Sequence, residues 1–191
     1  MKRNRMMNLV AAGVLIAAGV YGQTVNERRE NQQDRIAQGI SSGQLTAGET
    51  AQIERQEAGV NQQIHQDRQA NGGTLTPAER QQVQGEQNAM SGQIYADKHN
   101  AAQTNFHGEV GAWQELQQQR IAQGVGSGSL TAGETARLEH SEAGLNREIH
   151  TDRAANGGTL TGQEKRQVNR QQNRMSGRIY RDKHNAARQP K

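Results

Sequence analysis

The chain has no cysteine, one phenylalanine, one tryptophan and two prolines among its 191 residues. Without cysteine it can form no disulfide and has neither a thiol nucleophile nor a thiolate metal ligand. Hydrophobic residues make up only 31% of the chain and aromatic ones 3%. Such a composition lies near the limit at which apolar burial can offset chain entropy. We therefore expect no large core with a deep enzyme pocket.

Catalytic motifs are also scarce. We find no P-loop and no dinucleotide-binding Gly-x-Gly-x-x-Gly motif, and we expect no hydrolase nucleophile. The acidic side chains mostly lie near arginine, lysine or helix starts, which is typical of solvated helix faces. The sequence therefore predicts a protein that is not an enzyme and that uses no cofactor.

Residues 1–22 have the order of a secretory signal peptide. Three basic residues among the first five precede an apolar run over residues 9–20, and the small residue Gly22 follows. The run is short for a membrane span, which needs roughly 20 residues. We expect cleavage near Gly22, which would leave a mature chain with no integral membrane span. The protein would then be secreted or periplasmic in a bacterium. The alternative is that the segment is not cleaved and remains as a membrane anchor. Cleavage would leave 20 of the 23 basic side chains against 19 acidic ones.

The remaining chain is an internal duplication. The pentapeptide that begins at Arg35 returns at Arg120, an offset of 85 residues, and several other segments recur at the same offset. The two copies span residues 23–107 and 108–191. Short periods of this kind are typical of stacked supersecondary units.

The element Gly-x-Leu-Thr-x-x-Glu occurs four times and predicts helix starts. Its threonine suits the N-cap and its glutamate suits position N3, the arrangement of a capping box. The N-cap threonines would be Thr46, Thr76, Thr131 and Thr161. With one further helix before each pair, the sequence predicts an all-α fold of two tandem three-helix units joined by short glycine-containing turns. The third helix should run from Pro77 to about residue 102.

Each long helix carries only a narrow apolar stripe. In the second helix of the first copy the stripe is Ile53, Val60 and Ile64, which are spaced at helical period. Each such side chain contributes about 1.5–3 kcal/mol when fully buried. Isolated helices of this kind are marginal, so they must pack on each other, on the other copy or on a second molecule.

The same element resembles the second half of an EF-hand calcium loop. That resemblance implies Glu49, Glu79, Glu134 and Glu164 as weak candidate metal ligands. The earlier loop positions mostly lack oxygen ligands; in the first element they are Gln38, Ile40 and Ser42. No His-x-x-x-His pair is present, so we expect the histidines on the polar rims of helices. Capping alone accounts for the threonine and the glutamate, and we expect no metal site.

The last helix of the second copy is the most basic segment. Its arginines recur every four residues and lie opposite its apolar stripe on a helical wheel. They are Arg166, Arg170, Arg174 and Arg178, with Arg181 one turn further on. This face suits a phosphate-bearing partner such as a lipid head group or lipopolysaccharide, or another protein. Nucleic acid is disfavoured because aromatic residues do not interleave with the arginines. A solubilising charged face is the alternative.

The only Phe and the only Trp, Phe106 and Trp113, lie at the junction between the copies. Large apolar groups are best used at contacts, so we expect them to pack between the copies. An exposed patch that binds a partner is the alternative.

The strings R-I-A-x-G-x-x-S-G-x-L-T-A-G-E-T-A and Q-N-x-M-S-G-x-I-Y-x-D-K-H-N-A-A cover much of each copy. They resemble a group of uncharacterised exported repeat proteins of environmental bacteria. The resemblance implies export and a bacterial source and supplies no activity.

These observations favour a non-catalytic helical repeat protein that acts as a structural or interaction module of the cell envelope. Self-association is compatible with the thin apolar stripes. One alternative is a hydrophilic stress protectant of the desiccation type, and another is a degenerate EF-hand-like calcium-binding protein.

Overall fold

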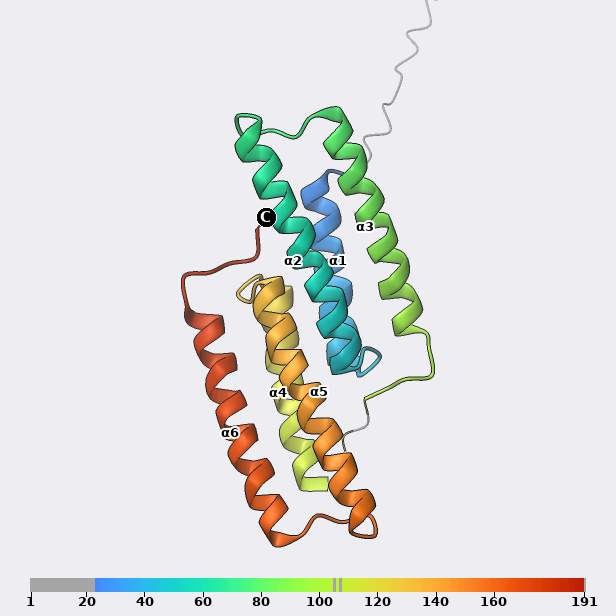
Figure 1. Cartoon of the computed structure of the whole chain (residues 1–191), viewed down its shortest axis with the longest axis vertical. Coiled ribbons are helices and arrows are strands. Elements are labelled where there is room, and N and C mark those ends of the chain that lie inside the picture. The colour runs from blue at the N-terminus through green and yellow to red at the C-terminus, as the bar shows by residue number, and fades with distance from the viewer. Residues whose placement is uncertain (1–22, 105, 107, 191) are drawn as a thin grey trace, which may run out of the picture.

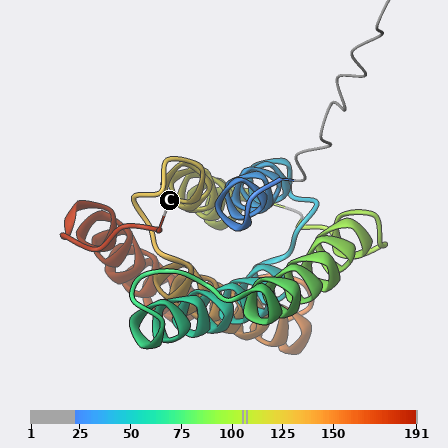
Figure 2. The same ribbon diagram turned by 90° about the horizontal axis from the view of Figure 1, so that it is seen from above.

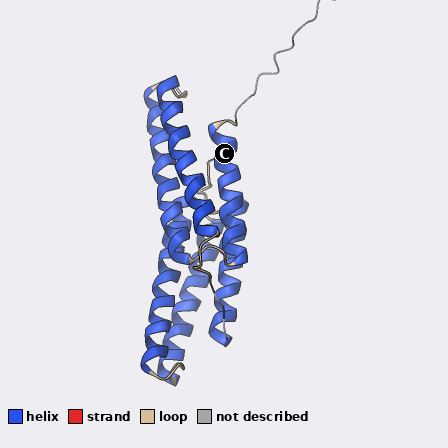
Figure 3. Cartoon of the chain, turned by 90° about the vertical axis from the view of Figure 1, so that its right-hand side faces the viewer, coloured by secondary structure: helices blue, strands red, loops and turns tan. Residues whose placement is uncertain are grey.

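The computed structural model describes residues 23–190 apart from 105 and 107, and these residues form six helices with no strand (Figures 1 and 3). The helices are α1 (Val25–Ser42), α2 (Ala47–Ala70), α3 (Pro77–Lys98), α4 (Gly108–Gly126), α5 (Ala132–Ala155) and α6 (Gly162–His184). The predicted all-α fold is confirmed. The predicted signal peptide, residues 1–22, lies outside the described residues. None of the described helices is long and apolar enough to cross a bilayer.

The four helices that follow a Gly-x-Leu-Thr-x-x-Glu element begin where that element predicts. In each, the threonine oxygen accepts the glutamate N–H and the glutamate carboxylate accepts the threonine N–H. At the start of α2, Thr46 N donates to Glu49 Oε2 at 2.8 Å. A fifth capping box, between Thr24 and Glu27, starts α1. The same Thr-x-x-Glu spacing is present in the sequence at this position, without the preceding Gly-x-Leu.

In each copy the turn after the first helix contains a glycine, and a later segment of the same copy hydrogen-bonds to that glycine. Gly43 and Gly128 adopt the left-handed φ values of 72° and 68° that favour glycine. Thr104 N donates to Gly43 O at 3.0 Å, and Gln189 N donates to Gly128 O at 3.0 Å. The segment after the third helix of each copy therefore ends beside that copy's first turn.

The third helix of the first copy is shorter than predicted. It ends at Lys98 instead of continuing to about residue 102. The side chain of Asn100 competes with the helix, because its Oδ1 accepts the Ala102 N–H at 2.7 Å and its Nδ2 donates to Glu49 Oε1 at 2.6 Å.

The two copies pack on each other through like helices. α2 packs chiefly against α5 and α1 chiefly against α4, whereas α1 touches α2 only slightly. Viewed from above, α1 and α4 lie side by side in one layer with α2 and α5 in the other, and α3 and α6 flank them at opposite edges (Figure 2). α3 contacts both α1 and α2, as α6 contacts both α4 and α5. The first and second helices of each copy therefore make most of their contacts with the like helix of the other copy.

One hydrophobic core spans both copies. It contains Ile36, Ile53 and Ile94 from the first copy and Ile121, Leu138 and Ile179 from the second, each at most 2% exposed. Two smaller clusters lie further out, one in each copy, around Val83 and Val168. Because each helix has only a narrow apolar stripe, the helices need this core between the two copies to be stable.

Glutamine side chains complete the interior where apolar side chains are few. Gln32 Nε2 donates to Gln87 O at 2.7 Å, and Gln117 Nε2 donates to Gln172 O at 2.7 Å, 85 residues further on. These glutamines are at most 2% exposed. Such buried amides stay in place because they join the first helix of each copy to the third by hydrogen bonds.

We expect Gly39→Ala to destabilise the fold by about 1–3 kcal/mol, the usual range for overpacking. A Cβ at Gly39 would lie 2.5 Å from Leu45 Cδ1, and Leu45 is 1% exposed in the core, so it has little room to move. Urea unfolding monitored by circular dichroism measures the change.

Gly85→Ala on α3 is the matched control, because nothing lies within 4 Å of a Cβ there. It should stabilise the fold by about 0.5–1 kcal/mol through helix propensity. Equal shifts in the two variants would contradict the proposed close contact at Gly39.

Candidate functional site

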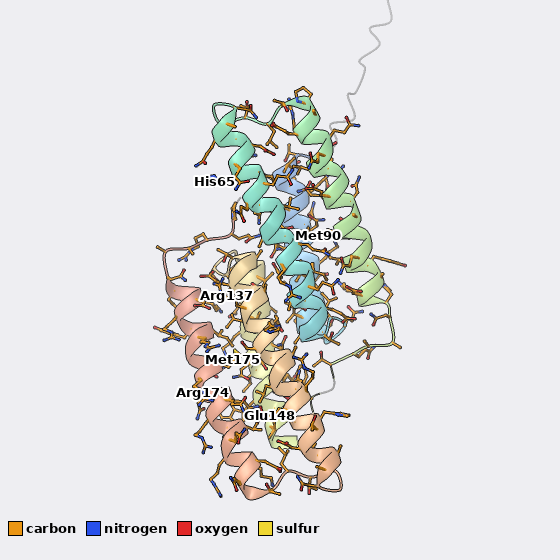
Figure 4. The ribbon with its side chains drawn as sticks, in the orientation of Figure 1. His65, Met90, Arg137, Glu148, Arg174 and Met175 are labelled. Atoms are coloured by element: carbon orange, nitrogen blue, oxygen red, sulfur yellow. The ribbon has the colours of Figure 1, made fainter. Side chains whose placement is uncertain are left out.

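The predicted arginine face lies on the outer side of α6. Arg166, Arg170, Arg174, Arg178 and Arg181 are all exposed. The opposite side of α6 carries its buried residues, which are Val168, Gln172, Met175 and Ile179. Figure 4 shows Arg174 on the outer side of α6 and Met175 on the side toward α4 and α5. At 1.5 Å per residue, the row from Arg166 to Arg178 is about 18 Å long.

The inner side of α6 is held by a polar seam. Gln167 Nε2 and Gln171 Nε2 donate to Glu148 Oε1 at 2.7 and 2.8 Å. On the α4 side, Gln117 Nε2 and Arg120 Nη2 each donate to Ser176 Oγ at 3.0 Å. These contacts fix the rotation of α6, so the arginines cannot turn inward without breaking them.

An acidic side chain, Asp182, lies near the end of the arginine row. Arg178 and Arg181 lie within electrostatic range of Asp182 on the same helix. Burial raises the pKa of Asp182, and the two arginines together with Arg137 oppose that rise. Asp182 thus offsets part of the charge of Arg178 and Arg181 at the end of α6. The four-residue spacing of Arg178 and Asp182 in the sequence already indicates that the two side chains are neighbours on the helix surface.

The first copy has no such face. At the places of Arg166, Arg170, Arg174 and Arg178, α3 carries Gln81, Gly85, Ala89 and Gln93. Since α3 and α6 flank opposite edges of the molecule (Figure 1), one edge is basic and the other is neutral at these positions.

The four glutamates considered as metal ligands are occupied by helix capping. The pKa values of Glu79 and Glu164 are lowered, first by the hydrogen bond from the backbone of the capping threonine. Each of the four carboxylates also accepts from an asparagine side chain, for instance Glu134 Oε1 from Asn185 Nδ2 at 2.6 Å. Among the described residues, no three His, Asp or Glu side chains form a group that could hold a metal ion.

The histidines at the ends of α3 and α6 stack on tyrosines. The ring centroids are 4.1 Å apart for Tyr95 and His99 and 4.2 Å apart for Tyr180 and His184. Both tyrosines are 64% exposed, and each histidine contacts the carbonyl of its tyrosine through Nδ1. These pairs close the last helical turn, in keeping with the expected polar rim.

One hydrolase-like pattern was overlooked in the sequence. Gly39 to Gly43 fits Gly-x-Ser-x-Gly, the motif of a serine nucleophile placed between a strand and a helix. Here it falls on the last turn of α1, and Ser41 Oγ donates to Gln38 O at 3.1 Å. The strand-to-helix context that would expose an activated serine is not present at this position.

Buried glutamates line the contact between α2 and α5. They are Glu54 and Glu57 on α2 and Glu139 and Glu142 on α5, each at most 1% exposed. Gln118 Nε2 donates to Glu139 Oε2 at 3.0 Å, and Gln33 Nε2 donates to Glu54 Oε2 at 3.4 Å. The other oxygen of each of these two carboxyl groups has no hydrogen-bond partner.

Burial favours the protonated form of these carboxyl groups. It raises the pKa of Glu139 to about 8 and the pKa values of Glu57 and Glu142 to about 7. It also raises the pKa of Glu54 well above its ordinary range, and the neighbouring Glu57 and Glu139 add to the rise. Arg29 opposes the rise at Glu57, and Arg120 opposes it at Glu142. Sequence patterns gave no sign of this cluster, because a glutamate on a polar helix is usually solvated.

The expected packing of the single tryptophan between the copies is wrong. Trp113 is 47% exposed and Leu116, one turn later on α4, is 51% exposed. Phe106 is half-buried and lies against Gly111, where a Cβ would come 2.7 Å from the Phe106 carbonyl carbon. α4 thus presents a small apolar patch where α1 has Arg28 and Asn31.

No protein-family model matches the chain, and comparison with curated proteins and with solved structures finds no significant similarity.

We expect the free energy of unfolding to fall as pH rises from about 4.5 to about 8. The ordinary glutamate pKa is 4.5, and the folded values for Glu57, Glu139 and Glu142 are about 7, 8 and 7. In this window the folded state retains protons that the unfolded state releases, so stability is greatest at the acid end. The lowered pKa values of Glu79 and Glu164 act below 4.5, outside this window. Urea unfolding across the window measures the slope.

Glu139→Gln should flatten this slope and raise stability near the alkaline end, because it replaces a buried acid by a neutral group of the same shape. Glu115→Gln, at an exposed position of α4, is the control and should leave the slope unchanged. A wild-type protein that becomes more stable between these pH limits would contradict the assigned cause.

Proposed function

We propose that this protein is an exported, non-catalytic binding module of the bacterial cell envelope, and that α6 contacts an anionic partner. The observation that carries the proposal is the row of exposed arginines at four-residue spacing, on a helix whose rotation is fixed by buried contacts. The proposal of export rests on residues 1–22 of the sequence.

The shape of the arginine face favours an extended or planar partner. The row is convex and about 18 Å long, and it turns by about 40° around the helix axis from one arginine to the next. An array of anionic groups, such as the head groups of an anionic lipid surface, matches such a row better than one small anion does. Guanidinium groups also bind phosphate oxygens in a bidentate manner.

We expect the triple variant Arg166→Gln, Arg170→Gln, Arg174→Gln to lose binding to vesicles that contain phosphatidylglycerol. Each basic side chain near an anionic surface contributes about 1 kcal/mol, so three should change the affinity at low salt by on the order of 100-fold. Wild-type binding should weaken as salt is added. Cosedimentation with vesicles over a salt series measures both effects.

The matched control removes three exposed arginines from other helices: Arg55, Arg80 and Arg147, all replaced by glutamine. It changes the net charge equally and should retain most of the binding. If the two triple variants lose vesicle binding equally, the effect is one of general charge, and the proposed role of the arginine face is wrong. Failure of the wild type to bind anionic vesicles better than phosphatidylcholine vesicles would also count against it.

A further inference from the structure

Two clefts lie where the copies meet. The first cleft, of about 720 Å³, is walled by the C-terminal half of α2, the first turn of α5 and the tail after α6. The second cleft, of about 660 Å³, is walled by the C-terminal half of α5, the first turn of α2 and the segment after α3. Both volumes are in the range of small-molecule sites. In Figure 1 the chain end after α6 crosses to α2. Arg188, Gln189 and Pro190 of this tail line the first cleft.

The walls of the two clefts correspond residue by residue at the offset of 85. Asn61, His65 and Arg68 of the first cleft stand where Asn146, His150 and Arg153 stand in the second. Figure 4 labels His65 on the α2 wall of the first cleft. The chain thus provides two versions of one site, and the differences between them indicate what each one can bind.

The decisive difference is a buried cation. The first cleft has Arg29 on α1, and the second has Gln114 on α4 at the same place. Gln114 is satisfied as a neutral group, since its Nε2 donates to Asn146 Oδ1. Arg29 is only 1% exposed; its Nη1 donates to Asn61 Oδ1 at 3.0 Å and its Nη2 to Asn26 Oδ1 at 3.2 Å, but its Nε has no partner.

The surroundings of Arg29 leave its charge incompletely balanced. Burial lowers its pKa and Arg68 adds to that effect, whereas Glu57 and Glu30 oppose it. Glu57 is itself a poor counter-ion near neutral pH, because burial raises its pKa to about 7. A buried guanidinium beside a second arginine and a carboxyl group that is only partly ionised near neutral pH is stabilised by an added anion.

The rest of the first cleft selects the kind of anion. Its walls contain no acidic side chain, and its accessible surface is mostly apolar, with Ala58, Ile64, Ala132 and Pro190 contributing. The first turn of α5 also lines the cleft, and Glu134 already caps this helix start together with Thr131. Gln189 Oε1 already accepts the Ala132 N–H at 2.8 Å, which fixes the tail as the outer wall.

We propose that the first cleft binds a small organic carboxylate with an aliphatic body, with its carboxylate at Arg29 and Arg68 and its aliphatic part along the α2 and tail walls. The second cleft, which has glutamine at the place of Arg29, binds such a ligand much more weakly. This site is separate from the arginine face of α6 and does not depend on it.

Isothermal titration of the full chain with octanoate tests the proposal, with 1-octanol and acetate as probes that lack the charge or the aliphatic body. We expect saturable binding of octanoate at one site and weaker binding of the other two. Arg29→Gln should weaken octanoate binding on the order of 10- to 100-fold, the usual effect of losing a hydrogen bond to a charged group. The substitution copies the residue that the second copy already tolerates at this place.

Three further variants make the result decisive. Gln114→Arg should create a second octanoate site, and Arg147→Gln, in the second cleft, should change nothing. Arg68→Gln, at a half-buried position, should weaken binding as well and serves if circular dichroism shows Arg29→Gln to be unfolded. The arginine-face triple variant should bind octanoate normally. The proposal is overturned if octanoate does not bind, if two equal sites are found in the wild type, or if neither Arg29→Gln nor Arg68→Gln weakens binding.

Discussion

The burial of apolar side chains across the two copies is the contact on which the rest of the structure depends. Within one copy, α1 and α2 barely touch, and each turns its main contact face toward the other copy. A single copy would therefore expose the faces of α1 and α2 that carry Ile36 and Ile53, two side chains that are at most 1% exposed in the whole chain. Loss of that burial would amount to about 1.5–3 kcal/mol for each, a large fraction of the stability of a small domain. Each copy is thus part of one folding unit.

A chain with so few apolar residues must fill part of its interior with polar ones, and this has two different outcomes. Buried glutamines such as Gln32 and Gln117 find backbone carbonyls and join neighbouring helices. Buried glutamates such as Glu54 and Glu139 find only one partner each and must take up protons to stay inside. The first group gives orientation with little sensitivity to conditions, and the second links the contact between the copies to pH.

Local features of the fold could be predicted from the sequence, and features that depend on which helices meet could not. The capping threonines fix the starts of α2, α3, α5 and α6 because the signal lies within four consecutive residues. The outward placement of Arg174 follows from the position of Met175 on the same helix. By contrast, the burial of Glu57 and the unpartnered Nε of Arg29 require knowledge that α1 and α2 lie against the other copy. The exposure of Trp113 escaped prediction for the same reason.

Comparing the two copies distinguishes residues that build the fold from residues that serve a binding site. Positions that build the interior match across the offset, as the hydrogen bonds of Gln32 and Gln117 do. Differences between the copies include the outer face of α6, the apolar patch on α4 and the floor of the first cleft. Arg29 is a buried charge at a place where the second copy has glutamine, and burying a charge is costly. Its hydrogen bonds to Asn61 and Asn26 and its attraction to Glu57 offset part of that cost, but its Nε has no partner. This is why the first cleft, more than any feature shared by both copies, points to an anionic ligand.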